Sequence, residues 1–172
     1  MEAPLSGPQR EIFQKLRASE GPRCFSYVHP RLFRGGQPSL LQLADLKALG
    51  VTTIVSLRRE DSGITAAEKR EALRLGMKFF HFPFYGIFGA SHSFVERVLG
   101  AMRDPDNGVV YIHCQRGRDR TSLLVALHLV IDHAWHAELA WQQAVLDYGF
   151  QLTFWYRRMR RVFVSVVAAH NK

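Results

Sequence analysis

Cysteine is scarce in this sequence, and long apolar runs are absent. The 172 residues include two cysteines, Cys24 and Cys114. Two are too few for a disulfide scaffold or a cysteine-based structural zinc site, so we expect at least one free thiol. No apolar run approaches the ~18 residues of a membrane span, and the opening stretch MEAPLSGPQREIF lacks the apolar segment of a secretory leader. We therefore expect a cytoplasmic protein; a secreted form whose leader has been removed is the alternative.

Acidic residues are also in the minority. The chain has 15 Asp and Glu against 23 Lys and Arg, which gives a formal charge of +8 and a pI near 10.0. This balance favours anionic partners such as phosphorylated small molecules, phosphoproteins, nucleic acid or anionic lipid. Hydrophobic residues make up 47% and charged residues 22%, which is ordinary for a globular domain. We expect residues 1–20 to be a partly loose segment and residues 21–172 to form a single domain.

Strand and helix signals alternate along the chain. Apolar and β-branched runs indicate strands at 32–36, 51–58, 77–84 and 108–114. Helical spacing and end signals indicate helices at 39–49, 65–76, 93–103, from 120 onward, 136–149 and 153–167. Ser39 with Gln42, and Thr65 with Glu68, have the spacing of capping boxes. This order predicts an α/β fold with a central, mainly parallel sheet of four to five strands, flanked by helices and followed by a helical C-terminal part.

The most informative segment is GVVYIHCQRGRDRTSLLV, residues 108–125. Cys114 ends the apolar strand, and a helix begins near Arg120. Ligands of an open α/β sheet bind beyond the carboxyl ends of its strands, and the amides at a helix N-terminus attract a dianion. The same field favours a thiolate, because a cysteine beside cations at a helix N-terminus titrates below the usual value of about 8.5.

Three neighbours of Cys114 have matching chemistry. Arg120 offers a forked guanidinium for two phosphoryl oxygens. Gly117 permits the backbone turn that directs amides inward. Thr121 can donate its hydroxyl to the Cys114 sulfur and help the thiolate leave in a second step. A cysteine at the end of an apolar strand is more often an inert thiol, which is our interpretation of Cys24, but the combined pattern predicts a nucleophile at Cys114.

The stretch HCQRGRDRTS resembles the His-Cys-x5-Arg-Ser/Thr signature of the cysteine-dependent protein tyrosine phosphatase superfamily. RLFRGGQPS, followed by a helix and VTTIVSLR, is similar to the opening segment of compact dual-specificity-like phosphatases, so the resemblance covers most of the chain. It implies a phosphocysteine intermediate on Cys114, orientation of the loop by His113, and catalysis without a metal or cofactor. The phosphate-binding residues that it implies are Gln115, Arg116, Gly117, Arg118, Asp119 and Arg120.

The leaving oxygen needs a proton, and its donor is open. In many relatives an aspartate on a loop after the preceding strand supplies it, but HFPFYGIFGASHSF has no acidic residue before Glu96. Asp119 is a candidate, because Gly-x-Asp-Arg-Thr is similar to the loops of myotubularin-like and Sac-like phosphoinositide phosphatases, and repulsion from a bound phosphate would help it hold a proton. The competing interpretation is that Asp119 caps the following helix. His92 and His81 are weaker candidates, and a good leaving group would need no side-chain acid.

Surplus cations suggest a polyanionic substrate. Arg116 and Arg118 add charge to a loop that already has Arg120, and Arg34 lies in a segment that can reach the same sheet edge. We therefore expect an inositol polyphosphate phosphatase that resembles the tyrosine-phosphatase-like phytases.

Two alternatives remain. A protein tyrosine or dual-specificity phosphatase would use the Phe-rich residues 79–88 as pocket walls, although such rings are more often core. FWYRRMRR, residues 154–161, would suit an RNA 5′-phosphatase or RNA-binding module, although its spacing is better explained by an amphipathic terminal helix. We expect a monomer that acts on a phosphorylated small molecule or phosphoprotein, without nucleic acid as a partner.

Overall fold

A five-stranded sheet organises the chain. The computed structural model describes residues 5–59, 63–85, 90–146 and 154–170. The strands are β1 (Ser26–His29), β2 (Leu32–Gly35), β3 (Thr53–Ser56), β4 (Lys78–His81) and β5 (Val110–His113). Their order in the sheet is β1-β2-β5-β3-β4. β2, β5, β3 and β4 are parallel, and β1 pairs antiparallel with β2.

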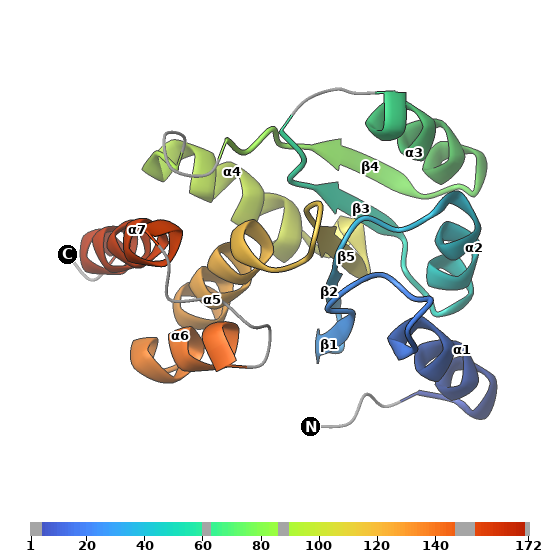
Figure 1. Cartoon of the computed structure of the whole chain (residues 1–172), viewed down its shortest axis with the longest axis horizontal. Coiled ribbons are helices and arrows are strands. Elements are labelled where there is room, and N and C mark those ends of the chain that lie inside the picture. Colours follow the sequence, from blue (N-terminus) through green and yellow to red (C-terminus); the bar gives the residue numbers. More distant parts are fainter. Residues whose placement is uncertain (1–4, 60–62, 86–89, 147–153, 171–172) are drawn as a thin grey trace.

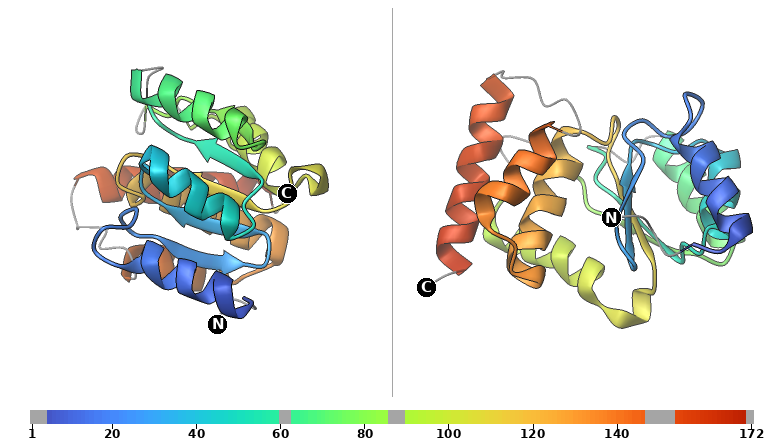
Figure 2. Two further views of the ribbon diagram at one scale, coloured as in Figure 1. Left: turned by 90° about the vertical axis from the view of Figure 1, so that its right-hand side faces the viewer. Right: turned by 90° about the horizontal axis from the view of Figure 1, so that it is seen from below.

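Helices cover both faces of this sheet. One layer contains α1 (Gly7–Arg17), α2 (Leu40–Ala48) and α3 (Gly63–Arg74). The other contains α4 (His92–Arg103), α5 (Asp119–His133), α6 (Ala137–Leu146) and α7 (Phe154–His170), with the short 3-10 turn η1 (Pro105–Asn107) between α4 and β5. Figure 1 and the right-hand view of Figure 2 show the sheet between the two helical layers. None of the described helices combines the length and apolar character that a membrane crossing needs.

The buried strands are apolar on both sides because both faces are covered. Side chains alternate along a strand, so neighbouring residues enter different cores. Ile54 and Tyr111 belong to the core under α1–α3, whereas Val55 and Ile112 belong to the core under α4–α7. This explains why residues 51–58 and 108–114 read as continuous apolar runs and confirms the α/β class.

The predicted helices are largely present, but α3 does not begin at the residue that the sequence predicted. At α2, the Ser39 Oγ accepts from the Gln42 amide at 3.2 Å and the Gln42 side chain accepts from the Ser39 amide at 2.8 Å, as expected of a capping box. At α3, the helix begins at Gly63, and both Thr65 and Glu68 are buried inside it. The predicted second capping box is therefore wrong.

Two elements were not predicted. Residues 7–17, expected within a partly loose segment, form α1, with Leu16 buried against the sheet. The sequence does not predict β1, because this half-buried edge strand has no continuous apolar run. For α6, the described helix ends at Leu146, and the predicted residues 147–149 lie outside the described residues.

The C-terminal helix is amphipathic. Met159, Phe163 and Val166 are buried, while Arg157 and Arg161 are exposed. This agrees with the amphipathic interpretation of FWYRRMRR; the side chains of residues 154 and 155 lie outside the described part.

Candidate active site

The segment from Cys114 to Arg118 lies at the carboxyl edge of the sheet, between the end of β5 and the start of α5. β5 is the central strand, so the segments that follow β2 and β3 flank it. The Gln37 amide donates to the Gln115 carbonyl at 3.2 Å, and the Leu57 amide donates to the His113 carbonyl at 2.8 Å. The segment is therefore held on both sides by the ends of neighbouring parallel strands.

The loop leaves its own amides available. Within the described part of the chain, the backbone N–H groups of residues 115–118 have no backbone partner. The first amides of α5 follow directly, and they lack intrahelical partners in any α-helix. A row of free donors at a helix N-terminus is a site for a dianion.

Gly117 sets the turn of the loop. Its φ is +69°, in the left-handed region. A Cβ at this position would lie 2.3 Å from the Gly35 carbonyl carbon and 2.4 Å from the Gly36 nitrogen. Both the dihedral and the close approach of the β2 end require glycine, in agreement with the sequence prediction.

Arg34 supports the loop from beneath. Its side chain is 1% exposed, and its Nη2 donates to the Gly117 carbonyl and to the Ser122 Oγ, each at 2.7 Å. One buried guanidinium thus ties the turn at Gly117 to the first turns of α5 and places a positive charge beneath the loop. The sequence suggested Arg34 for the substrate edge; the structure instead gives it a positioning role.

Glu68 and His113 form a second buried support. The His113 Nε2 lies 2.9 Å from the Glu68 Oε1, and both side chains are at most 1% exposed. The other ring nitrogen lies 3.2 Å from the Cys114 carbonyl oxygen. α3 is therefore linked through His113 to the backbone of Cys114, which fits the orienting function predicted for His113. Sequence analysis missed Glu68 here because its spacing from Thr65 also fits a capping box.

Cys114 and Thr121 are the buried groups at the centre of the site. Cys114 is 2% exposed and Thr121 fully buried. The Thr121 Oγ1 has no hydrogen-bond partner among the described residues. A buried hydroxyl without a partner costs free energy, so its retention beside the loop suits a donor kept for a thiolate or a phosphoryl oxygen.

Arg120 is fixed at the mouth of the loop. Its Nη1 donates to the Leu57 carbonyl at 3.0 Å, and the side chain is only partly buried. This bond uses one edge of the guanidinium and holds the side chain at the end of β3. The remaining donors are available to an incoming oxyanion.

Arg116, Arg118 and Asp119 form the outer rim. Gln115 and Arg116 are exposed. The Arg118 Nε lies 3.6 Å from the Asp119 Oδ1, and these side chains are 29% and 43% exposed. The N-cap of α5 is Arg118, and Asp119 is the first helical residue. Asp119 is thus a first-turn acid rather than the N-cap, and it is accessible from the loop.

The other candidate acids are less well placed. His92 lines a cavity of about 280 Å³ together with Ile131 and His170. Ile131 lies twelve residues beyond Asp119, or about 18 Å along α5, so His92 faces away from the loop. The His81 ring bonds the Arg58 carbonyl through Nε2 at 3.0 Å, which orients the segment after β3.

The aromatic residues predicted as pocket walls differ in their exposure to solvent. Phe84 is fully buried and packs 5.0 Å from the Phe94 ring, so it is core. Tyr85 is 50% exposed with the Arg59 guanidinium 5.7 Å from its ring centre. Residues 86–88 of the predicted Phe-rich wall, 79–88, lie outside the described residues.

Cys24 is half-buried and free. Burial raises the pKa of its thiol; the positive charges of Arg34 and Arg118 lower it, and the nearby Cys114 raises it. Cys24 therefore keeps its proton more firmly than an ordinary cysteine, which agrees with its interpretation as an inert thiol.

Fold and site together have the features of the tyrosine phosphatase and dual-specificity class. Beyond the central strand of a mainly parallel sheet lie a buried cysteine, a loop whose amides have no backbone partner among the described residues, and an arginine six residues after the cysteine. The family model described as "DSP-PTPase phosphatase fused to NAD+ Kinase" matches residues 13–149, which is most of the chain. The chain belongs to this family, named PTP-NADK.

Individual relatives agree with this assignment. The probable tyrosine-protein phosphatase DG1060 of Dictyostelium discoideum is 30% identical over 109 residues, which are 60% of this chain and 64% of that protein. The chain thus spans less than two thirds of that relative's length. TpbA of P. aeruginosa has a TM-score of 0.70 at 19% identity, over 91% of this chain and 99% of its own. The core catalytic domain of the PP-IP phosphatase SIW14 from S. cerevisiae has a TM-score of 0.69 at 18% identity, over 87% and 93%. At these identities the two structures show the shared fold.

Proposed function

We propose that the chain hydrolyses phosphate monoesters through a phosphocysteine on Cys114 and acts on polyanions such as inositol polyphosphates. The observation that carries the proposal is the buried Cys114 at the end of β5, next to four loop amides that have no backbone partner in the described ranges and to an Arg120 held by the Leu57 carbonyl. This set of groups matches a phosphoryl dianion in charge and in donor number.

In the first step the Cys114 sulfur attacks phosphorus, an S–P bond forms and the ester P–O bond breaks. The electron pair of the broken bond goes to the leaving oxygen, which takes up a proton. Loop amides and Arg120 hold the equatorial oxygens, where negative charge must be stabilised. In the second step water attacks phosphorus, the S–P bond breaks, and inorganic phosphate leaves. The Thr121 hydroxyl then donates to the released sulfur anion.

Asp119 is the proposed proton donor to the leaving oxygen. It is 43% exposed at the rim and follows the loop directly. In the second step the same carboxylate accepts a proton from the attacking water. His81 and His92 are not part of this proposal. The His81 ring is bonded to the Arg58 carbonyl, and His92 lines a cavity with Ile131, far along α5 from the loop.

The rim supports a polyanionic substrate. Arg116 is exposed and Arg118 partly exposed, and neither is needed for the single phosphate that Arg120 and the amides hold. A second phosphate on the same ring would meet these cations. SIW14, which shares the fold, is a PP-IP phosphatase, which agrees with this proposal.

A protein tyrosine phosphatase is the second candidate. A variant of TpbA has been solved in complex with pTyr, and the two chains share a fold at a TM-score of 0.70. The exposed Tyr85 and the neighbouring Arg59 provide an aromatic surface and a cation that a phosphotyrosyl peptide would need.

One substitution pair separates the two candidates. Arg116→Ala with Arg118→Ala should raise the KM for inositol hexakisphosphate about tenfold, which corresponds to about 1.4 kcal/mol, and change that for a phosphotyrosyl peptide less than about twofold. The matched control is Arg157→Ala with Arg161→Ala, which removes two exposed charges from α7. A larger increase in KM for the phosphotyrosyl peptide than for inositol hexakisphosphate would favour protein substrates. Micromolar RNA binding by a Cys114→Ser variant at physiological salt would favour the RNA alternative.

A further inference from the structure

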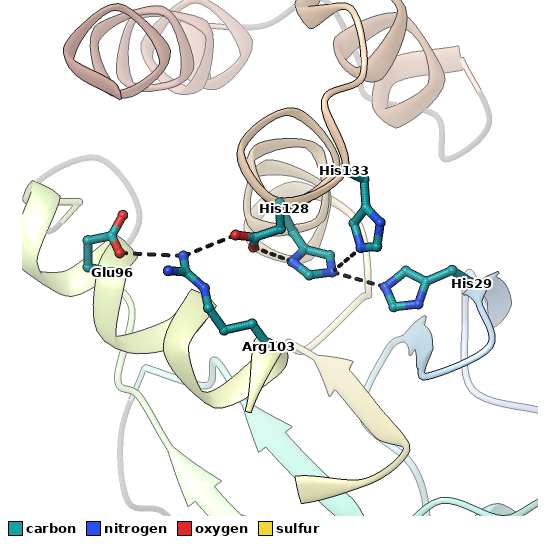
Figure 3. Close-up of polar contacts among 6 residues, drawn as sticks. His29, Glu96, Arg103, His128 and His133 are labelled. Carbon is teal, nitrogen blue, oxygen red and sulfur yellow. Dashed lines mark hydrogen bonds and ion pairs between the residues drawn. The ribbon is translucent and has the colours of Figure 1, made fainter. Parts of the chain in front are cut away.

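Three histidines converge at the end of the sheet opposite Cys114. His29 ends β1, and His128 and His133 lie in the C-terminal half of α5. Figure 3 shows the three rings pointing toward one another from these two elements. His128 lies nine residues beyond Asp119, about 14 Å along the helix axis, and His133 about 21 Å. The cluster is therefore separate from the candidate active site.

The ring nitrogens are spaced like the ligands of one small ion. The His128 Nε2 lies 2.9 Å from the His29 Nε2 and 3.2 Å from the His133 Nε2. The ligand atoms of all three lie within 4.8 Å of one another. Zn–N bonds of 2.0–2.1 Å in tetrahedral geometry put neighbouring nitrogens about 3.3 Å apart. Small ring movements would bring the remaining pair, His29 and His133, to the same spacing.

The central ring is held as metal-bound histidines are. The His128 Nδ1 lies 2.7 Å from the Asp132 Oδ2, so this nitrogen carries the proton and Nε2 presents its lone pair to the cluster. Asp132 is itself fixed, because its other oxygen lies 3.3 Å from Arg103, which also contacts Glu96 at 3.4 Å. A carboxylate on the outer nitrogen fixes the tautomer and raises ligand basicity.

Hydrogen bonds alone satisfy this cluster poorly. The single lone pair on the His128 Nε2 faces two nitrogens, and it can accept one well-aligned hydrogen bond. Burial lowers the pKa of His29 to about 4, helped by His128, His133 and Arg31, and burial likewise lowers the pKa of His128. Burial thus disfavours the charged form of both rings, and neutral imidazole is the form that binds metals.

Other charges and contacts oppose a cation here. Arg31 and Arg103 add positive charge beside the cluster, and the carboxylates of Asp132 and Glu96, both in contact with Arg103, offset part of it. The Arg31 amide also lies 3.3 Å from the His29 Nδ1, a long hydrogen bond that His29 must give up to present Nε2. Arg31 holds the Gly108 and Asp104 carbonyls through its guanidinium, which keeps its charge at the turn before β5.

We propose that His29, His128 and His133 bind a divalent transition-metal ion of the Zn²⁺ type, which joins the edge strand β1 to the end of α5. Imidazole suits Zn²⁺ and its neighbours. Three protein nitrogens leave a fourth position for water, on the side where His133 is exposed. The metal stabilises the fold and takes no part in phosphate hydrolysis, since the cluster is far from Cys114.

The test is metal titration of the full chain in a Cys114→Ser background, which removes the catalytic thiol as a competing ligand. After chelator treatment, Zn²⁺ should bind at one equivalent per chain, raise the melting temperature and slow amide exchange in β1. Co²⁺ should give the visible bands of a nitrogen-ligated, four-coordinate ion. His29→Gln or His133→Gln should weaken binding more than tenfold, and Asp132→Asn should weaken it about 10- to 100-fold.

His170→Gln removes an exposed histidine of α7 and is the matched control, with unchanged affinity. His133 is exposed, so its variant folds and keeps the test decisive. The proposal is overturned if the parent chain binds no Zn²⁺, or if binding is equal in the His133→Gln and His170→Gln variants.

Discussion

Replacing Arg34 by methionine should loosen the catalytic loop more than the rest of the fold. The guanidinium makes two bonds of 2.7 Å, to the Gly117 carbonyl and the Ser122 hydroxyl, and both are buried. Hydrogen bonds from a charged donor contribute about 1.5–3 kcal/mol each, or about 3–6 kcal/mol together. Removing a buried charge recovers part of its desolvation cost, so the net loss should be about 2–4 kcal/mol. For a chain of this size that lowers the melting temperature by about 6–12 °C.

The assay is vanadate affinity and phosphatase activity, measured well below the melting temperature. Arg34→Met should bind vanadate at least tenfold more weakly, and Arg34→Lys should recover part of the loss. Arg31→Met is the matched control, because the Arg31 guanidinium likewise makes two hydrogen bonds, in its case to two backbone carbonyls, but lies at the turn before β5. If the two methionine variants lose stability alike and also keep vanadate affinity alike, Arg34 does not position the loop.

Two further substitutions test the loop. Asp119→Asn should lower kcat on an alkyl phosphate about 10²- to 10⁴-fold and on para-nitrophenyl phosphate less than tenfold, since a good leaving group needs little protonation; equal slowing on both substrates would reject Asp119 as the acid. Gly117→Ala should abolish vanadate binding, because its Cβ would lie 2.3 Å from Gly35 and φ is +69°. Gly100→Ala, in open space on α4, should leave vanadate binding unchanged, and intact binding in Gly117→Ala would refute the proposed loop geometry.

The sequence predicted the sheet and the loop because both depend on local patterns. β-branched runs covered on both faces are continuous in sequence, and a strand, a loop and a helix in succession determine where Cys114 and Arg120 lie. β1 and α1 were harder to predict. An edge strand with four half-buried residues has little apolar signal, and α1 has a mostly polar sequence with Leu16 as its buried residue.

Long-range polar contacts could not be predicted. Arg34 and Gly117 are 83 positions apart, and Glu68 and His113 come from different elements that only the fold brings together. The spacing of Thr65 and Glu68 along the chain predicted a capping box, whereas Glu68 in fact contacts His113 at the end of β5. The histidine cluster was missed for the same reason: His29 lies 99 positions from His128. The spacing of His128, Asp132 and His133 along one helix was the available local signal.

The most direct test of the central claim is to trap the covalent intermediate. The enzyme is quenched in acid during turnover of a fast substrate, digested and analysed by mass spectrometry. We predict a single phosphoryl group on the peptide that contains Cys114, present in a Cys24→Ser variant and absent in Cys114→Ser, which should also lose hydrolysis. Undiminished phosphate release by Cys114→Ser, or a phosphoryl group found on another residue, would contradict the account.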